Sequence, residues 1–165
     1  MQYNLKSMGV KIFYVTKSKL EELQKEYAEL CAFEHKKGLG QEAPKLFESE
    51  DISAEFLSFQ EDVGFLRSRI DELKEIIDHH EIIKNPPRDK QDMVGVGARV
   101  RIEVDGQRDE LEIVGTLEAN PAMGRISNES PVGRALIGHK IGDEIVVPSP
   151  ARTTYKIKNI KYEVS

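Results

Sequence analysis

Hydrophobic residues in the first half of the chain recur at the spacing of a helix. Within residues 56–77 they advance by steps of three and four, which is the stripe of a coiled-coil helix sustained over about three heptads. We predict a helix from about Glu55 to Glu81, which at about 1.5 Å per residue would be roughly 40 Å long. The stripe consists of Phe56, Phe59, Val63, Leu66, Ile70, Leu73 and Ile77.

A shorter stripe upstream predicts a partner helix. Either Thr16 or Ser18 can cap its first turn, and Gly38, Gly40 and Pro44 follow as residues that break or loosen a helix. Because a single connector joins the two helices, they must return antiparallel, with the connector at the far end of a helical hairpin. The upstream stripe consists of Leu20, Leu23, Tyr27 and Leu30.

The second half of the chain follows a period of two. Apolar and charged residues alternate over 100–104, Asp105-Gly106 has the chemistry of a tight turn, and an apolar return run follows at 111–115. Residues 155–162 form another alternating run, which Lys158-Asn159 interrupts. We predict strands in these three runs, with the first two joined as a β-hairpin.

Between the strands, residues 130–138 predict one short helix. Ser130 occupies the N-cap position, Pro131 the first helical position, and Gly138 lies just past the end. The fold class is therefore α+β, with a small domain of strands packed on a short helix behind an antiparallel coiled-coil hairpin. The expected boundaries are 1–84 for the hairpin, 85–92 for a proline-bearing linker and 93–165 for the small domain.

Charge is distributed unevenly along the chain. The net charge is −5, and residues 93–165 contribute none of it because their acidic and basic residues balance. Residues 42–62 hold seven acids against the single base Lys45, so the excess sits in and beside the connector of the hairpin. A protein that binds free duplex DNA tightly shows a basic stripe instead. We therefore expect no independent high-affinity DNA binding.

The overall composition narrows the class further. The chain has 165 residues, of which 39% are hydrophobic, and no run approaches the roughly 18 apolar residues of a membrane span. Its first 16 residues lack the apolar core of a secretory signal, so we expect a cytoplasmic protein without membrane contact. The single cysteine, Cys31, excludes an intrachain disulfide, and the four histidines show no metal-ligand spacing.

The second half of the chain contains an ordered set of short motifs. They are Ile113-Val114-Gly115, Glu118-Ala119-Asn120-Pro121, Arg125-Ile126-Ser127, Ser130-Pro131-Val132-Gly133-Arg134-Ala135-Leu136-Ile137-Gly138 and Ile141-Gly142-Asp143-Glu144. This set resembles the bacterial Gre family of transcript-cleavage elongation factors (GreA and GreB). The resemblance extends into the hairpin, where Val15-Thr16, Gly64-Phe65-Leu66 and Arg69-Ile70 also look like the family.

The resemblance implies a fold and a mechanism. Family members dock through an FKBP-like C-terminal domain on the coiled coil at the rim of the secondary channel, in the largest subunit of RNA polymerase. Their hairpin enters that channel, where two tip carboxylates help hold a second catalytic Mg²⁺, and the polymerase itself hydrolyses backtracked RNA. The chain would then be an accessory factor that binds no cofactor stably alone. Carboxylate oxygens are the protein ligands that Mg²⁺ commonly takes.

The resemblance also proposes site residues. The usual family tip, Gly-Asp-Leu-x-Glu-Asn-Ala-Glu-Tyr, corresponds here to residues 48–56, and two alignments leave Glu48, Glu50 and Asp51 as the catalytic and metal-holding candidates. The resemblance assigns polymerase docking to Ser127, Ser130 and Pro131, although a serine–proline helix start also has a purely structural explanation. Contact with the 3′ segment of the nascent RNA falls to Lys36, Lys37, Arg67 and Arg69, for which a solvated helix face is the alternative.

Two further functions are consistent with the same architecture. A factor of this shape with an altered acidic tip can enter the channel and inhibit polymerase without stimulating cleavage. An FKBP-like domain can also be a prolyl isomerase, but that activity needs an apolar, largely aromatic pocket. Residues 93–165 contain no Phe and no Trp, and Tyr155 and Tyr162 are their only aromatic residues. The sequence therefore favours the transcription factor over the isomerase.

Overall fold

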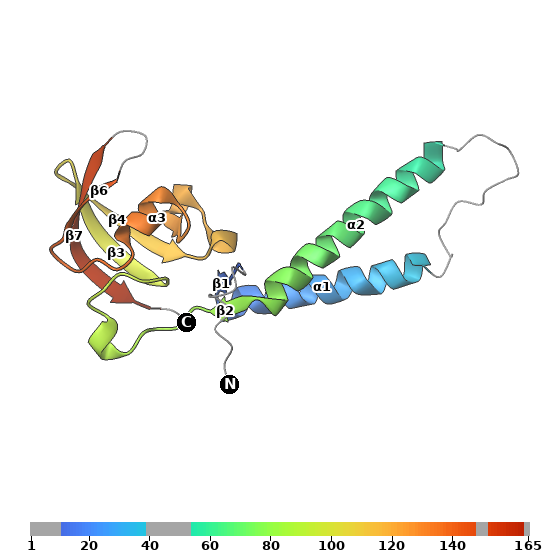
Figure 1. Ribbon diagram of the computed structural model, residues 1–165, viewed down its shortest axis with the longest axis horizontal. Coiled ribbons are helices and arrows are strands. Elements are labelled where there is room, and N and C mark those ends of the chain that lie inside the picture. Colours follow the sequence, from blue (N-terminus) through green and yellow to red (C-terminus); the bar gives the residue numbers. More distant parts are fainter. Residues whose placement is uncertain (1–10, 39–53, 148–151, 164–165) are drawn as a thin grey trace, which may run out of the picture. The chain divides into compact units, whose positions relative to one another are not determined.

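The computed structural model describes residues 11–38, 54–147 and 152–163, with the backbone alone for 37, 38 and 54–56. Those residues form two compact units. One contains residues 20–79, which make the helical hairpin, and the other contains the chain on both sides of it (Figure 1). Among the described residues, no helix is both long and apolar enough to cross a membrane.

Two long helices build the hairpin. Helix α1 spans Lys17–Gly38 and ends at the first of the expected helix breakers, and helix α2 spans Ala54–Asp78. Thr16 is the cap of α1, since the Lys19 amide donates a hydrogen bond of 3.2 Å to the Thr16 hydroxyl. The predicted end of the second helix, at about Glu81, was wrong, because α2 ends at Asp78 and residues 80–82 form a strand.

The hydrophobic seam of the hairpin is buried over only part of its length. From α1, Leu20 and Leu23 are buried, and from α2, Ile70, Leu73 and Ile76. Ile76 replaces the predicted Ile77, which is half-buried. At about 100° per residue the two isoleucines flank the direction of Leu73 on either side, so a single stripe could not distinguish them.

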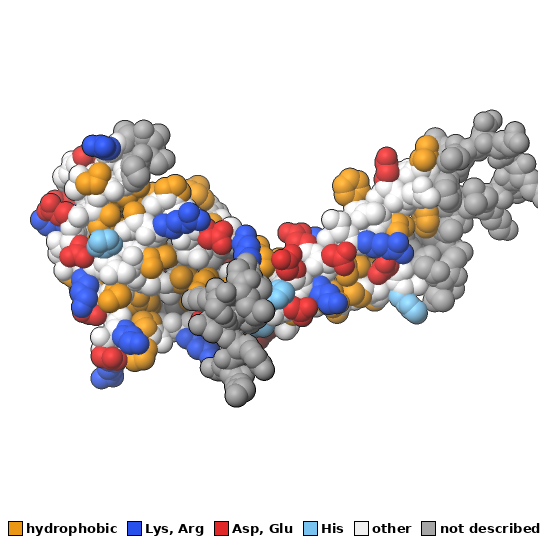
Figure 2. Space-filling model, viewed as in Figure 1, with side chains coloured by type: hydrophobic (Ala, Val, Ile, Leu, Met, Phe, Trp, Pro, Cys, Tyr) orange, Lys and Arg blue, Asp and Glu red, His pale blue; other side chains and the backbone are white. Residues whose placement is uncertain are grey.

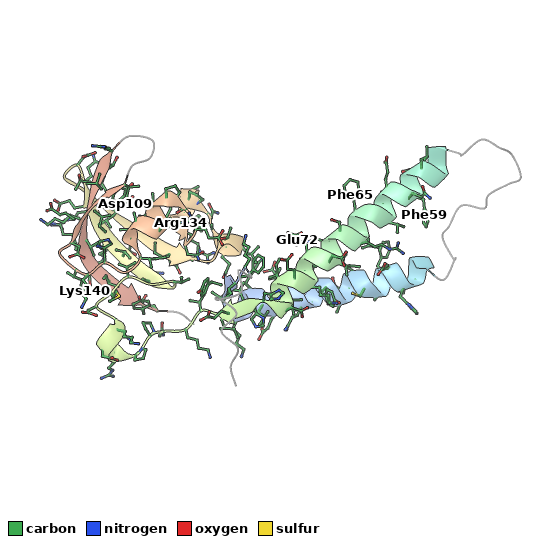
Figure 3. The ribbon with its side chains drawn as sticks, in the orientation of Figure 1. Phe59, Phe65, Glu72, Asp109, Arg134 and Lys140 are labelled. Carbon is green, nitrogen blue, oxygen red and sulfur yellow. The ribbon has the colours of Figure 1, made fainter. Side chains whose placement is uncertain are left out.

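Burial declines along the hairpin toward the ends of the helices at residues 38 and 54. Val63 and Leu66 are half-buried, whereas Phe33 is 44% exposed and Leu57 is 49% exposed. Phe65 is 77% exposed, and Figure 3 shows it on the side of α2 that faces away from α1. The hydrophobic side chains of the seam are therefore well buried near the first turns of α1 and more exposed toward residues 38 and 54.

The residues just before and just after the hairpin in the sequence form a small parallel sheet that was not predicted. Strand β1 (Phe13–Val15) pairs with β2 (His80–Ile82), and the Ile83 amide donates to the Val15 carbonyl at 2.9 Å. Through this pairing, residues 11–19 and 80–84 group with the second half of the chain. The expected boundaries 1–84 and 85–92 differ from this division, because they assigned both strands to the hairpin.

The larger unit is built on a five-stranded sheet with the order β5-β4-β3-β7-β6. Strand β5 runs parallel to β4, and the other neighbouring pairs are antiparallel. The strands are β3 (Ala98–Val104), β4 (Gln107–Val114), β5 (Arg125–Ser127), β6 (Glu144–Val147) and β7 (Thr153–Tyr162), joined by helix α3 (Pro131–Leu136) and by the 3₁₀ turns η2 (Arg88–Lys90), η3 (Thr116–Glu118) and η4 (Pro121–Met123).

Two local sequence signals shape this sheet as predicted. Asp105 and Gly106 have φ values of 50° and 79°, and positive φ at both central residues defines the type I′ turn that matches the twist of a β-hairpin. Strand β7 carries the predicted interruption. Arg101 pairs with Asn159 but Ile102 pairs with Ile157, so Lys158 is an extra residue that forms a β-bulge.

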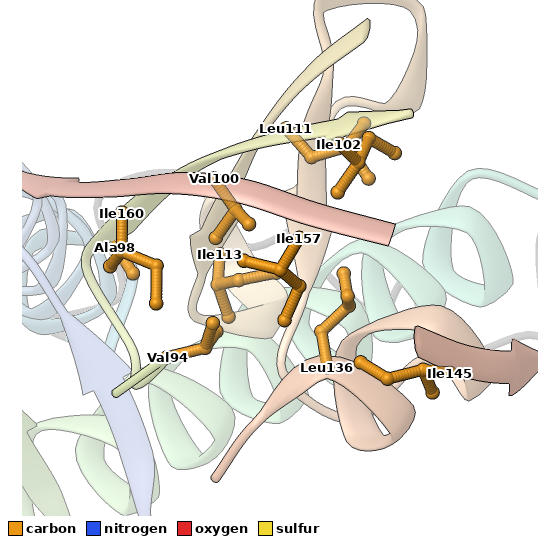
Figure 4. Close-up of a cluster of buried hydrophobic side chains, with 10 residues drawn as sticks. All are labelled: Val94, Ala98, Val100, Ile102, Leu111, Ile113, Leu136, Ile145, Ile157 and Ile160. Atoms are coloured by element: carbon orange, nitrogen blue, oxygen red, sulfur yellow. The ribbon is translucent and has the colours of Figure 1, made fainter. Parts of the chain in front are cut away.

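One buried cluster holds the strands and α3 together (Figure 4). It takes residues from β3, β4, β6 and β7 and is closed by Leu136 of α3. This arrangement confirms the predicted α+β class. The cluster consists of Val94, Ala98, Val100, Ile102, Leu111, Ile113, Leu136, Ile145, Ile157 and Ile160.

Candidate functional site

The acidic candidates lie outside the described residues. Glu48, Glu50 and Asp51 belong to the segment 39–53 between the two helices of the hairpin. Of the acid-rich window 42–62, the structure describes the side chains of Glu61 and Asp62, which are exposed on α2. The described residues contain no group of three or more side chains that could hold a metal ion. The metal-holding role of the three acids therefore stays a prediction.

Arg69 joins the two helices of the hairpin. Its Nε and Nη2 atoms donate to the two carboxylate oxygens of Glu26 at 2.8 and 3.1 Å, and its Nη1 atom donates to Glu72 at 2.8 Å. The hydrogen bonds that Arg69 donates to Glu26, followed by the one that it donates to Glu72, raise the pKa of its guanidinium. A bidentate pair of this kind is stronger and more directional than a single contact, so Arg69 fixes the register of α1 against α2.

The other members of the predicted basic group are arranged differently. Arg67 donates from Nε to Glu34 at 2.8 Å, a second ion pair between the helices. Lys36 is exposed near the end of α1, and the side chain of Lys37 is not among those described. Figure 2 shows acidic and basic side chains close together along the hairpin. The two arginines thus have a structural function, and contact with RNA stays a prediction for all four residues.

The structure brings two of the predicted docking residues together at the start of α3. The Ser130 hydroxyl accepts from the Gly133 amide at 3.0 Å and donates to the Ser127 carbonyl at 2.8 Å. A Cβ atom on Gly133 would lie 2.1 Å from that carbonyl oxygen, so only glycine fits. Ser130 therefore caps the helix as its spacing predicted, and Pro131 is exposed at the first helical position.

Ser127 is linked to a residue that the sequence analysis did not consider. Its hydroxyl shares a hydrogen bond of 3.2 Å with the hydroxyl of Thr116 and accepts from the Glu129 amide at 3.1 Å. The two hydroxyls come from η3 and the end of β5, which no periodicity connects. Thr116 directly follows the motif Ile113-Val114-Gly115, and this position in the sequence could have indicated it as a candidate residue.

A pocket of about 500 Å³ opens beside α3. Its apolar wall includes Val104, Ile126 and Val132, and charged residues of the β3–β4 turn form its rim. Tyr155 is the single aromatic residue among the described residues that line it. This pocket therefore lacks the largely aromatic lining that the prolyl isomerase alternative needs.

Comparisons with known proteins agree with the motifs. The family model described as "Transcription elongation factor, GreA/GreB, C-term" matches residues 89–162. A transcription elongation factor GreA from Thermomicrobium roseum is 37% identical over 141 residues, covering 84% of this chain and 90% of that protein. Another, from Lactococcus lactis subsp. cremoris, is 33% identical over 154 residues, covering 91% and 98%.

Among solved structures, the GreA factor homolog 1 (Gfh1) protein of Thermus thermophilus is 22% identical, with a TM-score of 0.40, and the match covers 92% of this chain and 99% of that one.

Relatives that span almost the whole chain place this α+β protein in the class of transcription elongation factors. The chain belongs to the GreA/GreB family.

Proposed function

We propose that this protein binds RNA polymerase, inserts the connector end of its hairpin into the secondary channel and stimulates cleavage of backtracked nascent RNA. The observation that carries the proposal is the concentration of seven acids against one base in residues 42–62, in and beside the segment that joins α1 to α2, in a chain of the GreA/GreB family. Membership of the family supplies the polymerase as the partner.

The chemistry of the three candidate acids suits this role. Glu48, Glu50 and Asp51 offer carboxylate oxygens, which Mg²⁺ accepts while keeping several of its waters. When held jointly with the polymerase, this second ion would align and activate the water that attacks the RNA. The chain itself would contribute charge and position only, which makes it an accessory factor rather than an enzyme.

Docking is assigned to the start of α3. We propose that Ser127, Ser130 and Pro131 face the coiled coil at the rim of the channel, in the largest polymerase subunit. Because the Ser130 hydroxyl is used within the domain, its contribution would be to hold the exposed Pro131 in place. Changing Ser130 and Pro131 to alanine together should weaken polymerase binding, and unchanged binding would move the docking surface elsewhere.

Contact with the RNA 3′ segment is assigned to Lys36 and Lys37, with Arg67 and Arg69 nearby. The ion pairs of both arginines across the hairpin weigh against direct contact by them. Lys36→Ala should therefore reduce stimulation more than Lys74→Ala, which removes an exposed lysine of α2.

A second function is favoured by one specific observation. Residues 48–56 read Glu-Ser-Glu-Asp-Ile-Ser-Ala-Glu-Phe and lack the Glu-Asn pair of the usual family tip. A hairpin that enters the channel without two correctly placed carboxylates would block it. The protein would then inhibit RNA synthesis without stimulating cleavage.

The decisive experiment measures RNA cleavage in stalled, backtracked elongation complexes with and without the protein. Release of short 3′ fragments that is lost in Asp51→Ala, and in Glu48→Ala or Glu50→Ala, supports the proposal if polymerase binding is retained. Glu61→Ala is the matched control, since it removes an exposed acid of the same window from within α2. Slowed synthesis without fragment release supports the inhibitory alternative. If the protein neither binds polymerase nor stimulates cleavage, both functions are contradicted.

A further inference from the structure

The first turn of α1 lacks the acid that its cap requires. In a capping box, Ser or Thr at the N-cap is followed three residues later by Glu or Gln, whose side chain returns to the N-cap amide. Here Thr16 is the N-cap, but the third position is Lys19, and the first turn contains no acidic residue. Two lysines near the positive end of a helix dipole also make this start intrinsically unfavourable.

Glu118 supplies the missing carboxylate from 102 residues away. Its Oε2 atom accepts from the Thr16 amide at 2.9 Å, and its Oε1 atom accepts from the Thr16 hydroxyl at 2.8 Å. Because the hydroxyl proton points to Glu118, its lone pairs are free to accept from the Lys19 amide. The cap of α1 is thus completed by a residue of η3, in the sheet domain.

The carboxylate itself is held in place. Its side chain is only 9% exposed, and Arg125 donates to the same Oε1 atom at 3.5 Å. A nearly buried acid that receives three donors is strongly oriented. The contact is thus a built feature rather than a chance meeting of two surface side chains.

The adjoining backbones approach as closely as the chain permits. A Cβ atom on Gly115 would lie 1.7 Å from the carbonyl oxygen of Tyr14, so residue 115 has to be glycine at this position. The segment from Tyr14 to Thr16 therefore lies directly on the segment from Gly115 to Glu118. Backbone contact and carboxylate contact act on the same three residues.

We propose that Glu118 is a positioning residue, which completes the N-cap of α1 and holds the first turn of that helix in place. The inference rests on the proposed function. Helix α1 has 22 residues and is about 33 Å long, so a tilt of about 10° at its first turn moves its far end by about 6 Å. A displacement of about 1 Å can already reduce a rate about 100-fold.

Four variants separate the effect of the Glu118 carboxylate from a general loss of protein stability. Glu118→Gln keeps the size of the side chain, but an amide has one acceptor oxygen for the two Thr16 donors. Thr16→Val removes the hydroxyl, and Thr16→Ser restores it. Glu103→Gln is the matched control, because it breaks an ion pair of the same domain, with Lys158 at 2.9 Å, that does not involve α1.

Cleavage kinetics provide the functional measurement. With Glu118→Gln and Thr16→Val, the maximal cleavage rate at saturating protein should fall about tenfold, in line with a misplaced catalytic group. The concentration for half-maximal effect should change less than about twofold, because the docking surface is untouched, and Thr16→Ser should restore the rate. Equal effects of Glu118→Gln and Glu103→Gln would overturn the proposal, as would a change confined to half-saturation.

A distance measurement tests the proposal even if the protein does not stimulate cleavage. Spin labels at Ala28→Cys on α1 and Arg108→Cys on β4, both exposed, are placed in a Cys31→Ser background. The distance distribution between them should broaden in Glu118→Gln and keep its width in Glu103→Gln. An unchanged width in Glu118→Gln would overturn the positioning role, whereas absence of cleavage by the unmodified protein would contradict the proposed function alone.

Discussion

The sheet domain and the hairpin achieve their stability in different ways. The domain buries a continuous cluster of ten residues contributed by four strands, one helix and the segment before β3. Among the described side chains of the hairpin, five are buried, in the first turns of α1 and the second half of α2, and the large hydrophobic ones beyond them are half or fully exposed. There the ion pairs of Glu26 with Arg69 and of Glu34 with Arg67 span the two helices.

The difference in burial predicts a difference in stability between the sheet domain and the hairpin. Most of the stability of helices in proteins comes from packing an apolar face. The described residues of the hairpin pack such a face in the first turns of α1 and the second half of α2, and directional ion pairs define the register of the helices further along. We therefore expect stability to decrease along the hairpin from there to the connector.

The largest effect should come from the domain core. Leu136 is fully buried at the end of α3, and Leu136→Ala should destabilise the protein by about 2–5 kcal/mol, because it leaves a cavity. Ile137→Ala, at the next residue, is the control, since Ile137 is 36% exposed. Chemical denaturation measures both, and similar losses for the two variants would contradict the comparison.

A core change in the hairpin should act locally. Leu73 is fully buried, so Leu73→Ala should cost about 2–3 kcal/mol, with faster hydrogen exchange confined to residues 20–79. Phe65→Ala removes a larger side chain that is mostly exposed and should change stability by less than about 0.5 kcal/mol. Faster exchange throughout β3 and β4 in Leu73→Ala would show that the two units unfold together.

The ion pairs should contribute less than either core. Arg69→Met keeps much of the side-chain volume but loses the bidentate pair with Glu26, at an expected cost of about 1 kcal/mol that falls with added salt. Lys25→Met is the control, because the contact of Lys25 with Glu29 is 3.9 Å long and lies within α1. Helical circular dichroism during thermal unfolding can compare the two, and a salt-independent effect of Arg69→Met would point to packing instead.

The smallest expected effect is that of low pH on the stability of the sheet domain. Hydrogen bonds from Lys158, Arg101 and Lys156 lower the pKa values of Glu103, Glu110 and Glu144 respectively. A lowered folded-state pKa gives stability that is present above the ordinary value of 4.5 and is lost as the pH falls through the lowered value.

The melting temperature should therefore be constant down to about pH 5 and decrease slightly toward about pH 3. Because these side chains are exposed, salt should weaken the dependence. A melting temperature that rises on acidification would contradict the sign.

Local signals made much of the fold predictable. The Asp105-Gly106 turn, the interruption at Lys158 and the cap at Ser130 each depend on neighbouring residues, and each is present in the structure. The α1 cap at Thr16 was one of two alternatives. The two helices were predicted from their stripes and their antiparallel arrangement from the single connector, although Ile76 and Ile77 required tertiary contacts to be distinguished.

Non-local contacts were not predictable from the same patterns. Strands β1 and β2 have three residues each, too few for a visible alternation, and they pair across the whole hairpin. At the candidate site, Ser127 and Ser130 are close in sequence and their proximity could be expected. The partnership of Glu118 with Thr16 has no local signature except the missing acid in the first turn of α1.

The distance in sequence between Thr16 and Glu118 has a consequence for biosynthesis. Ribosomes add about 5–20 residues per second, so about 5–20 seconds pass after the cap residue is made before its carboxylate partner exists. During that interval the emerging first helix has two lysines and no acid in its first turn. The nascent chain therefore acquires its completed N-cap only after residue 118 has been synthesised.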